Sequence, residues 1–171
     1  MPKRIEVRIS GLGGQGVVLA GEILGRAAVY EGKNAVQTQS YGAEARGTAA
    51  KSEVIISDSR IGFPKVRKCD ILVAMSQSAV EEHLKDLKEK GILIVDEDTV
   101  KHLPKTKAKV FKIPAAKTAE IYANVVMLGA LTKITGIVKE EAVEKAIADS
   151  VHETAREANI KAFKEGLKLI V

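Results

Sequence analysis

The sequence predicts a three-layer α/β/α domain with a mostly parallel central sheet and at least one antiparallel strand. Residues 4–28 read as a β-strand, a glycine-rich turn and a helix, the order in which many α/β folds begin. Two continuous apolar runs, at 70–75 and 92–95, are typical of parallel strands that are buried on both faces. The chain has 171 residues, so its simplest organisation is one domain, residues 1–171, with a core of its own.

The first strand and the first helix are indicated by two different periodicities. Residues 4–9 alternate charged and apolar side chains, which is the period-2 pattern of a strand. After the turn, apolar residues recur at the spacing of a helix, which predicts a helix there. They are Val17, Ala20, Leu24, Ala27 and Ala28. Gly21 and Gly25 lie on this helix and leave room for it to approach the sheet closely.

The turn between them contains Gly11, Gly13, Gly14, Gln15 and Gly16. A glycine turn that leads into a helix directs several backbone N–H groups toward one point and so attracts anions. Three of these glycines match the dinucleotide pattern G-x-G-x-x-G, which also requires an acidic residue at the end of the second strand. No acid stands at the end of residues 35–38, the predicted second strand. Two interpretations stay open: a nucleotide-binding turn, or glycines that only permit a tight turn and close helix packing.

A polar segment at residues 39–47 is predicted to be a loop after the second strand, at the edge where open α/β sheets bind ligands. The residues of this segment that could recognise a ligand are Tyr41, Glu44 and Arg46. The alternative for the two charged residues is an ion pair on the surface. If the first two strands are adjacent and parallel, this loop faces the glycine turn, and Arg46 can bind a phosphate or a carboxylate there.

The middle of the chain predicts further strands and a helix. Residues 51–57 are strongly β-forming and no helix follows them, so this strand is expected to be the antiparallel one. Residues 78–81 resemble a capping box that opens a helix to about residue 89. Two strands follow at 92–95 and 110–113. The adjacent inner strands are expected to be 4–10, 70–75 and 92–95.

The carboxyl-terminal third is predicted to be helical. One helix is expected over 115–135, on the spacing of Ile121, Val125, Leu128 and Leu131. Two more are expected over 140–148 and 153–169. Asn124 lies inside the first helix, although asparagine is a poor helix former. It is either a satisfied buried amide or a contact to a loop or a ligand.

The composition excludes several kinds of function. A net charge of +5 accompanies only 4% aromatic residues, too few stacking platforms to favour nucleic-acid binding. Cys69 is the only cysteine, so the chain by itself cannot form a disulfide or ligate an iron–sulfur cluster. His83, His102 and His152 are isolated from one another and indicate no metal site. No run approaches the roughly 20 apolar residues of a membrane span, and a cytoplasmic location is expected.

Three motifs together point to a known family. They are Gly11-Leu-Gly-Gly-Gln-Gly, the loop Tyr41-Gly-Ala-Glu-Ala-Arg-Gly, and Asn124 followed by Leu128-Gly-Ala. With these motifs the sequence resembles, over nearly the whole chain, the gamma subunit of 2-oxoacid:ferredoxin oxidoreductases. The 2-oxoglutarate branch is the more similar one, on residues 53–58, Phe63-Pro64 and 70–77.

The resemblance implies a Rossmann-like subunit of an enzyme whose chemistry lies on other chains. Such enzymes decarboxylate a 2-oxoacid on thiamine diphosphate, pass electrons through iron–sulfur clusters to ferredoxin, and release an acyl-CoA. Thiamine diphosphate, magnesium and the clusters are implied on alpha, beta and delta subunits, and CoA is implied as the co-substrate. This chain is then non-catalytic alone and part of a heteromer in the cell. An apolar face intended for partner subunits is left uncovered when the chain is isolated, so a homodimer is expected there.

The binding site predicted for this chain has no catalytic residue and no metal ligand. Its candidate residues are Gly11, Gly13, Gly14, Gln15, Gly16, Tyr41, Glu44, Arg46 and Asn124. The alternatives to the subunit interpretation are a stand-alone NAD(P)-binding dehydrogenase and a nucleotide-binding regulatory module, both motivated by the glycine turn.

Overall fold

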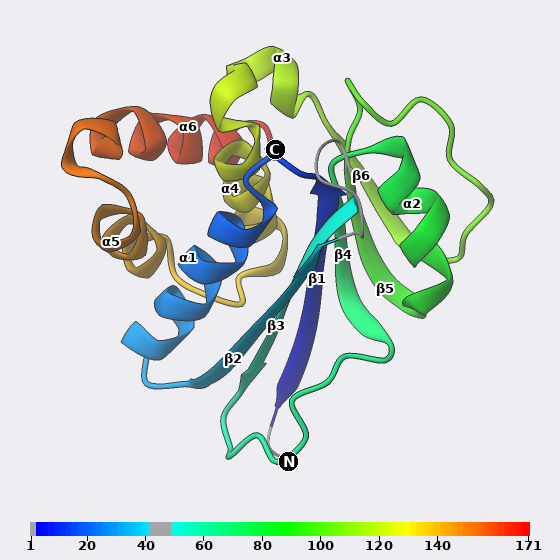
Figure 1. The fold of residues 1–171 in the computed structure, drawn as a ribbon, viewed down its shortest axis with the longest axis horizontal. Coiled ribbons are helices and arrows are strands. Elements are labelled where there is room, and N and C mark those ends of the chain that lie inside the picture. The colour runs from blue at the N-terminus through cyan, green and yellow to red at the C-terminus, as the bar shows by residue number, and fades with distance from the viewer. Residues whose placement is uncertain (1–2, 42–48) are drawn as a thin grey trace.

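The structure is a computed structural model that describes residues 3–41 and 49–171. These residues form one six-stranded sheet in the order β2-β3-β1-β4-β5-β6 (Figure 1). The strands are β1 Arg4–Leu12, β2 Asn34–Tyr41, β3 Ala49–Ser57, β4 Cys69–Ala74, β5 Leu87–Asp96 and β6 Lys109–Ile113. β3 is antiparallel to both of its neighbours, and β1, β4, β5 and β6 pair in parallel. The predicted α/β/α class is confirmed, and so is the adjacency of β1, β4 and β5.

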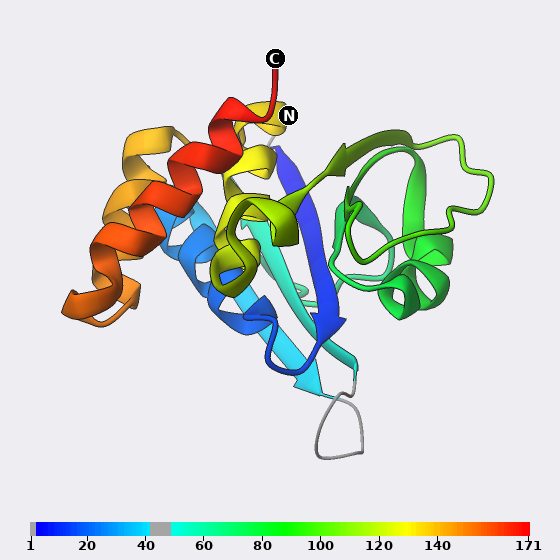
Figure 2. The ribbon, with the colours of Figure 1, turned by 90° about the horizontal axis from the view of Figure 1, so that it is seen from above.

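Helices cover both faces of this sheet. One layer contains α1 Val17–Tyr30, α4 Ala123–Thr135, α5 Glu140–Ser150 and α6 Arg156–Lys168. The opposite face is covered by α2 Gln77–His83, and α3 Ala115–Ala119 lies at one end of the sheet (Figures 1 and 2). Each layer has its own apolar core against the sheet, around Leu24 and Leu128 on one side and around Leu72 and Val80 on the other. The apolar runs of β4 and β5 are therefore buried on both faces, as the sequence predicts.

Small residues allow two close contacts in the larger helical layer. A Cβ atom at Gly21 would overlap the Ser52 side chain, which shows how closely α1 lies on β3. Where α4 crosses α6, a Cβ at Gly129 would overlap the backbone of Phe163, and one at Gly166 would overlap the backbone of Val126. Gly21 therefore sets the distance between α1 and the sheet, and Gly129 and Gly166 set the distance between α4 and α6, because a side chain there would push the two elements apart.

Two predicted helices are wrong in extent. The helix expected over 78–89 begins at Gln77, capped by Ser76, whose Oγ accepts the Ala79 N–H at 3.1 Å. It ends at His83, and a 3-10 turn, η1 Leu84–Asp86, leads into β5, where Leu87 is buried in the second core. The single helix expected over 115–135 is divided into α3, a 3-10 turn, η2 Glu120–Tyr122, and α4. Ile121 lies in that turn and is 84% exposed, so it does not belong to the apolar face that the spacing indicated.

The predicted adjacency of the first two strands is also wrong. β3 lies between β1 and β2 and pairs along its whole length with both, from Arg4↔Ser57 on one side and Asn34↔Ser57 on the other. β2 and β3 therefore form an antiparallel hairpin, and the polar segment after β2 joins these two strands rather than leading to a crossover. Within the described ranges, no helix is long and apolar enough to cross a lipid bilayer.

Candidate functional site

The glycine turn lies at the carboxyl end of β1, the edge of the sheet that also holds the end of β4 (Figure 1). Gly11 and Leu12 are still paired with β3, so the turn proper is Gly13–Gly16. Gly14 and Gly16 have φ angles of +93° and +74°, a region that side-chain-bearing residues rarely adopt. Gly16 is the residue immediately before α1, and its left-handed conformation starts the helix without a side-chain cap.

The side chain of Gln15 stabilises this turn through hydrogen bonds to backbone groups. Its Oε1 accepts the Leu12 N–H at 2.6 Å, and its Nε2 donates to the Met75 carbonyl oxygen, just beyond β4, at 2.9 Å. Its own N–H donates to the Leu12 carbonyl oxygen at 3.1 Å. Gln15, predicted as a binding residue, therefore uses its amide to join the turn to the neighbouring strand.

Asn124 closes the other side of the turn. It is 6% exposed, and its Nδ2 donates to the Gly16 carbonyl oxygen at 3.0 Å. A Cβ atom on Gly16 would overlap this same amide, so the glycine also provides the space that the asparagine occupies. Asn124 is thus a buried amide with a hydrogen-bond partner, and this partner lies in the glycine turn.

The turn leaves backbone donors directed away from these internal contacts. The N–H groups of Gly13, Gly14 and Gly16 have no hydrogen-bond partner among residues 3–41 and 49–171. The first turn of α1 carries no acidic side chain that would occupy the amino end of the helix. Such a set of donors, with the helix dipole behind it, can stabilise a phosphate or a carboxylate.

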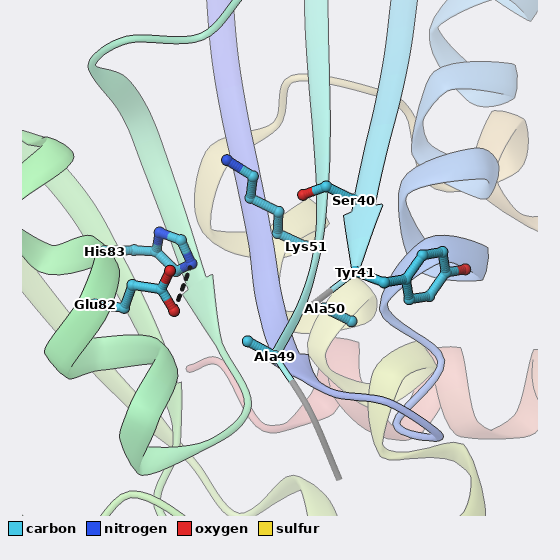
Figure 3. Close-up of a pocket in the computed structure, with 7 residues that line it drawn as sticks. All are labelled: Ser40, Tyr41, Ala49, Ala50, Lys51, Glu82 and His83. Atoms are coloured by element: carbon cyan, nitrogen blue, oxygen red, sulfur yellow. Dashed lines mark ion pairs between the residues drawn. The ribbon is translucent and has the colours of Figure 1, made fainter. Parts of the chain in front are cut away.

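A small cavity lies nearby, between α2 and the sheet edge where β2 ends and β3 begins (Figure 3). It has a volume of about 110 Å³ and is lined by Ser40, Tyr41, Ala49, Ala50, Lys51, Glu82 and His83. The Tyr41 ring points away from Glu82 and His83 and is 63% exposed (Figure 3). Glu44 and Arg46, the other two residues predicted in this region, lie outside the described residues, as does the rest of the predicted loop at 42–47.

Beneath this cavity is a buried ionic cluster centred on Arg8. Arg8 is 3% exposed and donates from Nε to Glu53 on β3 at 2.8 Å and from Nη1 to Asp86 in η1 at 2.7 Å. The same Nη1 lies 3.3 Å from Nδ1 of His83. Because a guanidinium only donates, this Nδ1 accepts and the proton of the neutral imidazole is on Nε2, which lies 3.8 Å from the Glu82 carboxylate.

The Arg8 cluster shifts the titration of its members. Burial, together with the adjacent guanidinium, lowers the pKa of His83. For Asp86, burial acts to raise the pKa, but the hydrogen bond and the charge of Arg8 outweigh it and the pKa is lowered. The sequence analysis did not identify this cluster, because the alternation of charged and apolar residues at 4–9 predicts a strand but does not indicate which partners Arg8 meets. The one feature of the sequence that indicates such a cluster is the density of charged residues in 81–86, which could contact Arg8.

The described residues do not present a donor set for an iron–sulfur cluster or another metal. Cys69 is buried at the start of β4, and desolvation raises its pKa to about 12, so its thiol stays protonated. No three side chains of His, Cys, Asp or Glu come together as metal ligands within residues 3–41 and 49–171.

Comparisons with known proteins identify the family of this chain. The family model described as pyruvate ferredoxin/flavodoxin oxidoreductase matches residues 6–169. The chain is 53% identical to 2-oxoglutarate synthase subunit KorC of Methanocaldococcus jannaschii, with 97% of this chain and 94% of that protein covered. It is 51% identical to the protein of the same name from Methanothermobacter thermautotrophicus, with 98% and 96% covered.

A solved structure has the same architecture. The crystal structure of the keto/oxoacid ferredoxin oxidoreductase gamma subunit from Geobacter sulfurreducens PCA is 47% identical in sequence and superposes with a TM-score of 0.86. The similarity covers 96% of each chain. The resemblance inferred from the three sequence motifs is therefore confirmed, and the chain belongs to the pyruvate ferredoxin/flavodoxin oxidoreductase family.

Proposed function

We propose that this chain is the gamma subunit of a 2-oxoglutarate:ferredoxin oxidoreductase, which converts a 2-oxoacid and CoA to an acyl-CoA and carbon dioxide and reduces ferredoxin. The observation that carries the proposal is 53% identity, over nearly the full length of both chains, to a 2-oxoglutarate synthase subunit. Its location in the cell is then the cytoplasm, where reduced ferredoxin is used.

The reactive groups of this enzyme belong to other subunits in the proposal. Thiamine diphosphate with magnesium supplies the decarboxylation, and iron–sulfur clusters supply the electron path, on alpha, beta and delta chains. The donor chemistry described above supports this division, since Cys69 is the only cysteine and its thiol is protonated inside the core. The gamma chain is inactive alone and forms a homodimer when isolated.

The glycine turn is the proposed contact of this chain with an anion. The N–H groups of Gly13, Gly14 and Gly16, which have no hydrogen-bond partner among the described residues, donate to either a phosphate of CoA or a carboxylate from a partner subunit. Gln15 and Asn124 do not bind the anion themselves but fix the turn in the conformation that presents these donors. We also propose Arg46 as a second ligand of the same anion, because a guanidinium can bind a phosphate or a carboxylate with two hydrogen bonds.

The substrate part of the proposal is tested on the assembled enzyme. The chain is co-expressed with its partner subunits, and kcat/KM for ferredoxin reduction is compared between 2-oxoglutarate, pyruvate and 2-oxoisovalerate. A preference for 2-oxoglutarate of about tenfold or more supports it, because a site that hydrogen-bonds the distal carboxylate strongly rejects substrates that lack one. Equal or greater activity with pyruvate refutes it.

A further inference from the structure

A second surface with ligand-binding character lies at the opposite end of the sheet from the glycine turn. It is formed by the connection from β3 to β4, residues 58–68, beside the start of β1 (Figure 1). A depression of about 460 Å³ opens there, lined by Arg4, Glu6, Phe63, Lys65, Arg67, Lys68 and Lys88, which we call the Phe63 surface. Five of these seven residues are cations and one is an anion.

The charge of the Phe63 surface is only partly neutralised by the residues that the structure describes. The carboxylate of Glu6 is bound by Arg4 at 2.8 Å, and Lys88 is bound by Asp70 at 2.8 Å. Lys65, Arg67 and Lys68 make no ion pair with any residue in 3–41 or 49–171. Three neighbouring cations without counter-charges create a positive potential that a negatively charged partner would neutralise.

The surface also contains an apolar anchor that is held in place. Phe63 is 52% exposed, and the Arg67 guanidinium lies over its ring at 5.2 Å from the centroid. The backbone beneath is fixed, since Arg4 donates to the Phe63 carbonyl oxygen at 2.8 Å and Val66 is buried in the core. An exposed aromatic ring that is fixed and stacked under a cation is a feature of interaction surfaces rather than of a solvated loop.

The mixture of residues points to a reversible partner rather than a permanent one. Permanent interfaces are largely apolar and depleted in lysine, whereas exposed lysines around one aromatic anchor favour fast, electrostatically steered encounters. We propose that the Phe63 surface is a docking site for a soluble acidic protein, which places carboxylates on Lys65, Arg67 and Lys68 and an apolar side chain on Phe63. This inference does not depend on the proposed function, because it concerns the other end of the sheet and none of the residues of the glycine turn.

The test uses the full chain and two labelled synthetic peptides, both rich in Asp and Glu, one with a central leucine and the other with serine in its place. Fluorescence anisotropy measures Kd at two salt concentrations. The variant carries Lys65→Gln, Arg67→Gln and Lys68→Gln, and the matched control carries Lys161→Gln, Lys164→Gln and Lys168→Gln on exposed positions of α6. Circular dichroism verifies that both variants are folded.

The expected result is a Kd that rises about tenfold or more in the Phe63-surface variant and stays within about twofold in the α6 control, since several ion pairs with the peptide are lost together in the first case only. Phe63→Ser is expected to weaken the leucine peptide more than the serine peptide, and added salt is expected to weaken both peptides. Equal losses in the two triple variants overturn the proposal, because they indicate a response to net charge alone.

Two further outcomes also contradict it. An oligothymidylate of equal charge that competes as well as the leucine peptide, with no effect of Phe63→Ser, identifies a general polyanion surface. Loss of peptide binding when the chain is purified together with its native partner chains identifies an interface with a fixed subunit. Retention of peptide binding in that preparation supports docking of a soluble protein.

Discussion

The Nδ2 atom of Asn124 lies 3.0 Å from the carbonyl oxygen of Gly16 and donates to it, although the two residues are 108 positions apart in the chain. This contact joins the amino end of α4 to the start of α1, next to the free N–H groups of the glycine turn. The geometry of the proposed anion site therefore depends on a helix from the carboxyl-terminal half of the sequence.

Replacing Asn124 by alanine is expected to lower the free energy of unfolding by about 0.5–1.5 kcal/mol, because the Gly16 carbonyl oxygen then loses one of its two donors and keeps only the Ala20 N–H. Asn159→Ala is the matched control, since Asn159 is 4% exposed and donates to the Ala155 carbonyl oxygen at 2.9 Å, away from the turn. Both variants lose stability in urea denaturation. Only Asn124→Ala is expected to lower the activity of the assembled enzyme under conditions where both are folded.

Gly16→Ala is expected to destabilise the chain more than Gly32→Ala. Both glycines have positive φ angles, +74° and +79°, so alanine costs about 1–2 kcal/mol of backbone strain at either position. At Gly32 the new Cβ meets no atom within 4 Å, whereas at Gly16 it overlaps the amide of Asn124. The additional loss of unfolding free energy at Gly16 is about 1 kcal/mol or more. It is measured as a lower thermal midpoint for Gly16→Ala than for Gly32→Ala. Equal losses contradict the packing described for the turn.

The parts of this fold that could be predicted are those with a local signature. The apolar runs of β4 and β5 and the glycines before α1 identify the parallel core and the position of the turn. The place of β3 between β1 and β2 could not be predicted, because the residue pattern of a strand does not indicate which other strands it pairs with. The break between α3 and α4 has no proline or glycine to indicate it.

For the candidate site, the sequence indicates where the glycine turn lies but not the role of each residue around it. Glycine spacing indicates where backbone N–H groups collect. It does not reveal that Gln15 and Asn124 use their amides inside the protein, since both depend on contacts with β4 and the α1 start that form only in the fold. Arg8 was missed for a similar reason, because the groups that bury it, Glu53 and Asp86, are distant in sequence.

Stability is expected to fall as the pH falls below 6.5, the ordinary pKa of histidine. The folded-state pKa of His83 is lowered by burial and by Arg8, so the unfolded chain binds the proton first and is favoured at acid pH. The contribution of His83 is complete above pH 6.5 and is lost as the pH falls through the lower folded-state value. Thermal midpoints between pH 5 and 8 measure this, and His83→Asn is expected to flatten the dependence. An unchanged dependence in that variant assigns the titration to another group.

Arg46→Lys keeps the positive charge and removes the planar fork that binds an anion with two hydrogen bonds. If Arg46 contacts CoA in the assembled enzyme, the Michaelis constant for CoA is expected to rise about tenfold while that for the 2-oxoacid stays constant. If the anion is a partner's carboxylate, size-exclusion chromatography shows weaker assembly instead. No change in either measurement contradicts the role proposed for Arg46 and leaves the loop glycines as determinants of shape.

The central claim is that this chain is an essential subunit without catalytic groups of its own. The most direct measurement compares CoA-dependent reduction of ferredoxin by 2-oxoglutarate for the isolated chain, for the partner subunits without it, and for the reconstituted assembly. The account predicts activity only in the assembly, and an isolated chain that has neither bound thiamine diphosphate nor iron–sulfur absorption. Turnover of a 2-oxoacid by the isolated chain, or its binding of NADH with a micromolar Kd, would contradict the account.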